Sequence, residues 1–297
     1  MAEIELRHNI MEIPSYDVKE WHKRTDTILI PMGSVEKHGP HVPTGTDAYV
    51  TIAVVERAAR LANVPHAPLM PYGYSPHHAG EVSWGTGTIT LPAEIYREVV
   101  YAIGRSLAFS GFNKLIYVSH HGSNSRPVEE PLRRLRWETG VFACWYKTPT
   151  ERETTVLKGI LEGPPEETPG WHSGELETAT MRAYEQEKDL PGLTRMERAP
   201  EWRRAHAPEW MGPAFTKRDG MPTVVFQESE NITVPMSHHE YADDGIIGNP
   251  HRNTTPEKGT RIFDRMAEHL SAFIEEVKKF EGFDPPPEKR DWPRRAW

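Results

Sequence analysis

The feature that most constrains the fold is an apolar run at residues 27–32 that stops abruptly at Gly33. The run, TILIPM, is short and apolar, which is typical of a buried strand. The following residues 33–47 contain two carboxylates and two imidazoles among three glycines and two prolines. Glycine and proline at this density predict a loop. The sequence therefore predicts a loop with metal-ligating side-chain types at the end of a strand.

Glu36, His38 and Asp47 are the side chains of this loop that suit metal binding. Glu36 and His38 are two residues apart, so in an extended chain both leave on the same face. Asp47 stands just before a helical pattern at residues 49–61, where it could serve as the N-cap. Alternatively, the loop returns Asp47 to the other two, and its carboxylate bridges a pair of divalent metals. The position of Glu36 and His38 favours the second interpretation.

Strand and helix patterns alternate along the chain after this loop. Strands are predicted at residues 66–70, 114–118 and 141–147, and helices at residues 48–62, 92–110 and 125–138. This alternation predicts an α/β protein with a three-layer α/β/α fold and a mostly parallel sheet. At 297 residues, the chain is most simply one domain over residues 1–297.

Two punctuated segments interrupt the pattern. Residues 148–171 hold several prolines and glycines, and we expect a flap there, because long loops in compact domains are often lids. Trp171 at the end of this segment either closes over a substrate or packs as a structural side chain. Residues 188–222 predict an irregular insertion whose clustered arginines indicate a solvated or subunit-facing surface. Residues 258–280 then predict an amphipathic terminal helix.

Composition narrows the class of partner. The net charge is 35 − 43 = −8, which argues against nucleic acid or an anionic membrane surface and favours a small molecule. Cys144 is the only cysteine, so no internal disulfide is expected, and a small buried hydrophobe is its simplest interpretation. Neither a signal-peptide pattern nor an apolar run of membrane length is visible, and we expect a cytoplasmic protein without membrane contact.

Several blocks, in one order, resemble the creatininase family of metal-dependent amidohydrolases. Residues 32–47 (MGSVEKHGPHVPTGTD) closely resemble the family's first signature. Later matching blocks are residues 72–75 (YGYS) with 85–91 (GTGTITL), 118–124 (VSHHGSN), 172–179 (HSGELETA), and 244–250 (DGIIGNP) with 255–259 (TPEKG). The matches span roughly residues 27–275. The resemblance implies a creatininase-like fold and a homo-oligomeric, ring-like assembly, with a hexamer favoured.

The resemblance also implies a centre of two divalent metal ions per chain, which could be zinc, manganese or iron. By this resemblance one metal is held by Glu36, Asp47 and His121, and the other by His38, Asp47 and Glu177, with Asp47 bridging. In creatininase a metal-binding glutamate lies two residues after the histidine that matches His121. Ser123 stands at that position here, so Glu177 is predicted as the fifth ligand.

Roles in catalysis and substrate binding follow from the same resemblance. His172 is expected as the general acid/base and Glu175 as a second catalytic candidate. The predicted substrate contacts are Ser75, Trp171 and His120. His77 and His78 lie in a loop rich in glycine and aromatic residues, and we expect them to be solvated rather than in contact with substrate. Residues 237–240 (SHHE) look metal-like in composition but lie outside the matched ligand blocks, so they are assigned mainly to a loop, which could lie near a neighbouring active site.

Three functions remain on this basis. The first is a metal-dependent hydrolase that cleaves a C–N bond in a small cyclic or linear amide. Family members commonly have Phe-Pro-Gly-Thr where this chain has GTGT at residues 85–88, so the substrate stays open. The second is ring-opening hydrolysis of a cyclic polyhydroxy ketone of the oxidised inositol type. The third is a non-catalytic metal-binding scaffold that retains the fold.

Overall fold

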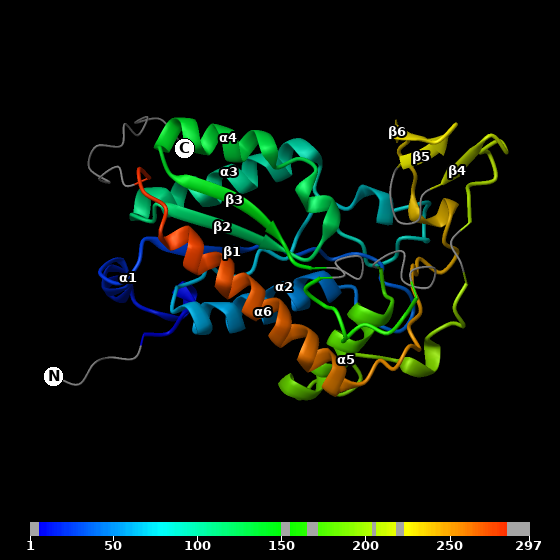
Figure 1. The fold of residues 1–297 in the computed structure, drawn as a ribbon, viewed down its shortest axis with the longest axis horizontal. Coiled ribbons are helices and arrows are strands. Elements are labelled where there is room, and N and C mark those ends of the chain that lie inside the picture. Colours follow the sequence, from blue (N-terminus) through cyan, green and yellow to red (C-terminus); the bar gives the residue numbers. More distant parts are fainter. Residues whose placement is uncertain (1–5, 150–154, 165–171, 204–205, 218–222, 284–297) are drawn as a thin grey trace.

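A computed structural model of the chain describes residues 6–149, 155–164, 172–203, 206–217 and 223–283 (Figure 1). Its main sheet contains the parallel strands β1 (Thr27–Pro31), β2 (Lys114–Ser119) and β3 (Phe142–Lys147), in the order β1-β2-β3. Residues 66–70, predicted as a strand, add single parallel bridges to Leu29 of β1 and to Met32 just after it. The predicted parallel sheet is therefore confirmed.

Helices cover both faces of this sheet, because alternate side chains of each strand point to opposite faces. Leu29, Ile116 and Val118 pack with α2 (Thr46–Ala62), α5 (Glu175–Lys188) and α6 (Pro256–Lys278). Ile28, Ile30, Leu115 and Tyr117 pack with α3 (Ala93–Ser110) and α4 (Glu129–Thr139) on the other face. A short helix, α1 (Ser15–His22), buries Trp21 at the edge of the body. The predicted three-layer α/β/α arrangement is confirmed (Figure 1).

Close packing of α6 on α5 fixes the helix that carries Glu175 and Glu177. A Cβ atom at Gly259 would lie 2.0 Å from the carbonyl oxygen of Ala179, so only glycine permits this backbone approach. The start of α5 is held from another side, because the backbone groups of His172 and Ile247 exchange hydrogen bonds of 3.2 and 2.8 Å. The first turn of α5 is thus a well-anchored part of the molecule.

A second, smaller sheet lies beyond the carboxyl ends of β1–β3 (Figure 1). It is antiparallel and consists of β4 (Phe215–Lys217), β5 (Thr223–Phe226) and β6 (Ser229–Thr233). β4 and the 3₁₀ helix η4 (Met196–Arg198) fall within the segment predicted as an irregular insertion. The segment after β6 contains Met236 and the 3₁₀ helix η5 (His238–Glu240), and it turns back toward the main body.

Part of the predicted flap is packed into the main core. Leu157 and Ile160 are buried beside α2, α5 and α6. The rest of that segment, including Trp171, lies outside the described residues. Within the described part of the chain, no helix is both long and apolar enough to cross a membrane.

Candidate metal centre

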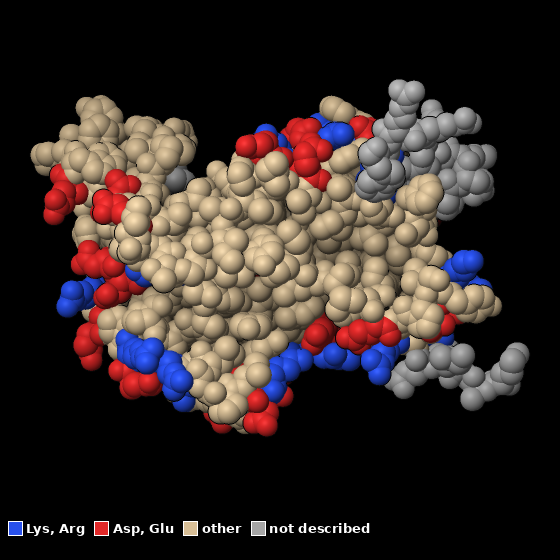
Figure 2. All heavy atoms as spheres, turned by 180° about the vertical axis from the view of Figure 1, so that it is seen from behind, with Lys and Arg blue, Asp and Glu red and all other residues tan. Residues whose placement is uncertain are grey.

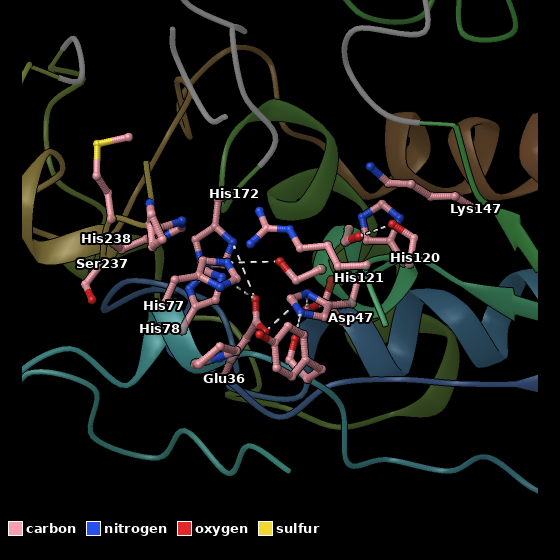
Figure 3. Close-up of a pocket in the computed structure, with 18 of the residues that line it drawn as sticks. Glu36, Asp47, His77, His78, His120, His121, Lys147, His172, Ser237 and His238 are labelled. Carbon is pink, nitrogen blue, oxygen red and sulfur yellow. Dashed lines mark hydrogen bonds and ion pairs between the residues drawn. The ribbon is translucent and has the colours of Figure 1, made fainter. Parts of the chain in front are cut away.

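A cavity of about 750 Å³ opens at the carboxyl ends of the sheet strands, and its lining includes most of the predicted site residues. Glu36 comes from the loop after β1, Asp47 from the first turn of α2, His121 from the end of β2, and Glu177 from the first turn of α5. Carboxyl ends of parallel strands are the usual place for ligand sites in α/β proteins. In Figure 3 Glu36, Asp47 and His121 converge from different elements on one region.

Asp47 is not the N-cap of α2. Gly45 occupies that position and makes no side-chain capping bond, while Asp47 is the second residue of the helix and is 2% exposed. The alternative interpretation of Asp47 as a plain N-cap is therefore wrong. A carboxylate in a first helical turn is favoured by the helix dipole, which lowers the cost of placing it in this buried position.

His121 lies between two carboxylates. Its Nδ1 is 3.2 Å from Oε2 of Glu36 and 3.2 Å from Oδ2 of Asp47. The other ring nitrogen, Nε2, lies 3.1 Å from the carbonyl oxygen of Tyr74, which can only accept a hydrogen bond. Nε2 therefore carries the proton of a neutral His121, and Nδ1 presents a lone pair toward Glu36 and Asp47.

His38 faces the opposite pair of carboxylates. Its Nε2 is 3.7 Å from Oδ2 of Asp47 and 3.6 Å from Oε2 of Glu177, and one ligand atom from each of the three residues lies within 4.8 Å of the others. His38 Nδ1 is 3.1 Å from the carbonyl oxygen of Glu36, to which it donates. The lone pair at Nε2 is thereby directed at the two carboxylates.

The residues present fit divalent cations. Three buried atoms that could bind a metal have no hydrogen-bond partner within the described structure: Oε1 of Glu36, Nε2 of His38 and Oδ2 of Asp47. Leaving buried polar atoms unsatisfied is costly, and native proteins rarely do so without a reason. Oxygen and nitrogen donors of this kind are the ligands that zinc, manganese and iron accept.

The electrostatics of the cluster also favour positive charge. Burial alone would lower the pKa of His121, but the carboxylates of Glu36 and Asp47 raise it to about 10. Burial would raise the pKa of Glu36, yet His121, His38 and His172 hold it well below its usual value. The buried carboxylates therefore stabilise a cation placed between them.

Glu177 is oriented by its neighbours. His120 Nε2 is 3.1 Å from Oε1 of Glu177, while His120 Nδ1 is 2.6 Å from the hydroxyl of Thr148. The backbone N–H of Ser173 donates to Oε2 of Glu177 over 2.5 Å. His120 was predicted to contact substrate. It lines the cavity, and its direct contact is with Glu177.

Glu175 faces away from the cavity. It is fully buried, and it accepts hydrogen bonds from the backbone N–H groups of Glu162 at 2.8 Å and Gly163 at 2.9 Å. Lys258 Nζ lies 2.5 Å from Oε1 of Glu175. Both oxygens are occupied by these partners, and the side chain does not line the cavity. These contacts do not support the predicted catalytic role of Glu175.

His172 stands at the wall of the cavity beside Glu36. Its Nε2 donates to the carbonyl oxygen of Lys37 over 2.7 Å, and its Nδ1 is 3.8 Å from Oε1 of Glu36. Burial and the neighbouring His38 lower the pKa of His172. A neutral His172 therefore presents the lone pair of Nδ1 toward the cluster.

Ser75 lies behind the cluster. The Ser75 hydroxyl is 2.6 Å from the hydroxyl of Ser34 and 3.3 Å from Nε2 of His121. The Ser34 hydroxyl also donates to Oε2 of Glu36 over 2.8 Å. Ser75 is fully buried and does not line the cavity. Its predicted contact with substrate is therefore not visible, and its contacts support Glu36 and His121. Trp171 lies outside the described residues.

Sequence reasoning missed three histidines. His78 is 2% exposed with Nε2 3.0 Å from Oε1 of Glu36, so the expectation that it is solvated is wrong. His77 and His238 also line the cavity (Figure 3). Burial lowers the pKa of both His77 and His78, so their neutral forms are favoured. The adjacent histidine pairs at residues 77–78 and 238–239 were the available signal, but nothing local placed them together.

Fold and site together define a class: an α/β protein with a buried centre of carboxylates and imidazoles that fits divalent metal ions. The family model for creatininase, described as creatinine amidohydrolase, matches residues 11–274. The chain belongs to the creatininase family, which confirms the resemblance seen in its motifs.

Relatives of known activity differ in what they act on. The chain is 30% identical over 168 residues to a 3-dehydro-scyllo-inosose hydrolase of Thermotoga maritima, covering 54% of this chain and 51% of that protein. It is 38% identical over 128 residues to a mycofactocin precursor peptide peptidase of Mycobacterium ulcerans, covering 40% and 49%. The chain thus spans about half the length of the curated relatives that it matches.

A solved structure of creatinine amidohydrolase matches with a TM-score of 0.69 over 93% of this chain and 100% of that one, at 21% identity. At this identity the likeness shows the shared fold.

Proposed function

We propose that this protein is a hydrolase with two divalent metal ions that cleaves a C–N bond in a small cyclic or linear amide. Glu36, Asp47 and His121 would hold one ion, and His38, Asp47 and Glu177 the other, with Asp47 shared. The observation that carries the proposal is the buried Asp47 carboxylate, whose Oδ2 lies 3.2 Å from His121 Nδ1 and 3.7 Å from His38 Nε2 and has no hydrogen-bond partner among the described residues.

A pair of bound dications would polarise the scissile carbonyl and lower the pKa of a water molecule so that it attacks near neutral pH. The donor set of carboxylates and imidazoles is compatible with zinc, manganese or iron.

His172 would act as the general base and then as the general acid. The hydrogen bond from its Nε2 to the carbonyl oxygen of Lys37 fixes the tautomer, which leaves Nδ1 free to accept a proton from the attacking water. The same Nδ1 would then deliver that proton to the leaving nitrogen. The ring of His38 packs against this ring at a tilt, with centroids 4.1 Å apart, and holds it in position.

A linear amide is supported by the peptidase relative, whose name indicates a peptide substrate. The second candidate is ring-opening hydrolysis of a cyclic polyhydroxy ketone, which the inosose hydrolase relative supports. The cavity of about 750 Å³ accommodates a small molecule of either type. A turnover screen with formamides, cyclic amides, short peptides and an oxidised inositol would separate them. Turnover of the ketone alone would replace the first candidate with the second.

The metal centre is tested by counting metal ions per chain in protein purified without chelator, for the wild type and for Asp47→Ala. About two ions per chain in this centre, lost in the variant, would support a bridged pair. An unchanged metal content would contradict the proposal. Bound metal without turnover on any substrate of the screen would favour the non-catalytic scaffold.

We also propose that the chain forms a homo-oligomer, with a hexamer favoured, and acts in the cytoplasm. Figure 2 shows one broad face where Lys, Arg, Asp and Glu are sparse and gather at the margins. Depletion of charge is typical of the buried centre of a subunit contact. Light scattering coupled to gel filtration measures the assembly, and a monomer at micromolar concentration would contradict it.

A further inference from the structure

Three imidazoles meet at one wall of the cavity, apart from the ligands of the proposed centre. His77 and His78 come from the 3₁₀ helix η2 (Pro76–His78), and His238 comes from η5. Their ring centroids are 4.1 Å apart for His77 and His78, 3.9 Å for His78 and His238, and 5.1 Å for His77 and His238. One nitrogen of each ring lies within 4.8 Å of the other two. We call these residues the three-imidazole cluster.

The contact with Glu36 leaves a lone pair on His78 for this cluster. Its Nε2 lies 3.0 Å from Oε1 of Glu36, an ion-pair distance without hydrogen-bond geometry, and a carboxylate oxygen at this position favours the tautomer that carries the proton on Nε2. The other nitrogen, Nδ1, is buried and has no hydrogen-bond partner among the described residues. A histidine that donates one N–H to a carboxylate and presents its other nitrogen is the usual arrangement of a metal-binding imidazole.

His77 also has one ring nitrogen in a hydrogen bond and the other unsatisfied. Its Nε2 is 3.2 Å from the hydroxyl of Ser123, while its Nδ1 is buried without a hydrogen-bond partner in the described part of the chain. A structural histidine in a core normally satisfies both ring nitrogens. Two neighbouring rings that each leave Nδ1 unsatisfied therefore indicate a missing shared partner.

We propose that His77, His78 and His238 bind a third divalent cation, a transition metal such as zinc or cobalt. Three imidazole nitrogens suit these metals better than magnesium or calcium, which prefer oxygen ligands. The rings all line the cavity, so a fourth coordination position would face the space that a substrate occupies. Three protein ligands with one open position is the arrangement of catalytic rather than structural zinc sites.

One residue would link the proposed cation to the two-metal centre. His78 would be its ligand, and the same ring contacts Glu36 of the two-metal centre. The site is additional to the proposed two-metal centre and uses none of its ligands, so either one can fail without the other.

Metal-free protein, prepared with a chelator that is then removed, is titrated with Co²⁺ while visible absorption and metal per chain are recorded. We expect about three equivalents for the wild type and about two for His77→Ala and for His238→Ala. The matched control is His239→Ala, the neighbour on η5 whose ring packs against Trp84 with centroids 5.6 Å apart, and it should keep about three equivalents. Asp47→Ala should keep the equivalent bound by the three-imidazole cluster.

Wild-type protein that binds only two equivalents, both insensitive to His77→Ala and His238→Ala, would overturn this inference. Three equivalents with no loss in either variant would overturn it equally. Loss of bound Co²⁺ in Asp47→Ala alone would support the two-metal centre and contradict the third site. Loss of bound Co²⁺ in His77→Ala and His238→Ala, but not in Asp47→Ala, would support the third site and contradict the two-metal centre. Circular dichroism establishes that each variant is folded. If His238→Ala does not fold, His238→Gln, which keeps the side-chain volume more closely, takes its place.

Discussion

Glu175 and Glu177 stand two residues apart in the first turn of α5, and both are buried with a partner at each oxygen, yet they face different surroundings. Glu175 has a fixed partner at each oxygen: the N–H groups of Glu162 and Gly163 and the ammonium of Lys258. Glu177 is held by His120 and the N–H of Ser173, but it lines the cavity and faces His38, whose Nε2 has no hydrogen-bond partner in the described structure. The comparison teaches that burial alone does not mark a functional carboxylate. The useful mark is an unsatisfied donor or acceptor beside it.

The largest expected effect separates these two glutamates directly. Glu177→Gln removes a charge that the proposed centre requires, so we expect loss of bound metal and a fall in turnover on the order of 10³-fold or more. Glu175→Gln should retain its metal, because its side chain does not reach the cavity. Metal per chain and initial rates on the two purified variants measure this. Equal loss of metal in the two variants would contradict the proposal that only Glu177 is a ligand.

The second prediction concerns the partner of Glu175. Lys258→Met leaves a fully buried carboxylate without its counter-ion, and removing one partner of a buried pair costs about 3–5 kcal/mol of unfolding free energy. Denaturant titration of metal-free protein measures the loss. The double variant with Glu175→Gln should recover a large part of it. A single variant as stable as the wild type would mean that this ion pair does not hold α5 to α6.

The third prediction concerns His172, which contacts the cluster without belonging to the proposed ligand set. His172→Gln should lower kcat about 10²-fold or more, because a positioned proton carrier is lost, while metal content is unchanged. Loss of metal together with activity would instead place His172 among the ligands. Rates measured against pH add a check, since the limb that belongs to the acid/base group should disappear in the variant.

Much of the fold was predictable because it depends on local patterns. Short stretches of sequence are enough to predict the apolar strands, the helices between them, and the ligand loop after β1. Asp47 was found for the same reason, because it stands in that loop. The antiparallel strand β4 was missed, since residues 215–217 are too few to show a periodic pattern within the predicted insertion.

What the sequence did not decide depends on long-range packing. Residues two apart on a helix point about 200° apart, so only one of Glu175 and Glu177 could face the cavity. Which one does is set by Lys258 on α6, far along the chain. Likewise, His77 and His78 meet His238 only because the segment after β6 returns to η2. No local sequence pattern predicts that these three histidines come together.

The smallest effect expected here tests how Glu177 is held. His120 bonds Glu177 through one nitrogen and Thr148 through the other, so it positions the carboxylate without binding metal in the proposed centre. His120→Ala should weaken metal affinity about 10- to 100-fold, the usual cost of losing a group that orients a ligand, and leave the number of bound ions unchanged at saturation. Competition with a chromophoric chelator measures this affinity. Thr148→Val, which removes only the distant hydroxyl, should give a smaller shift in the same direction. If His120→Ala instead leaves affinity intact and raises KM alone, the ring acts on substrate, and the orientation of Glu177 must come from the backbone N–H of Ser173.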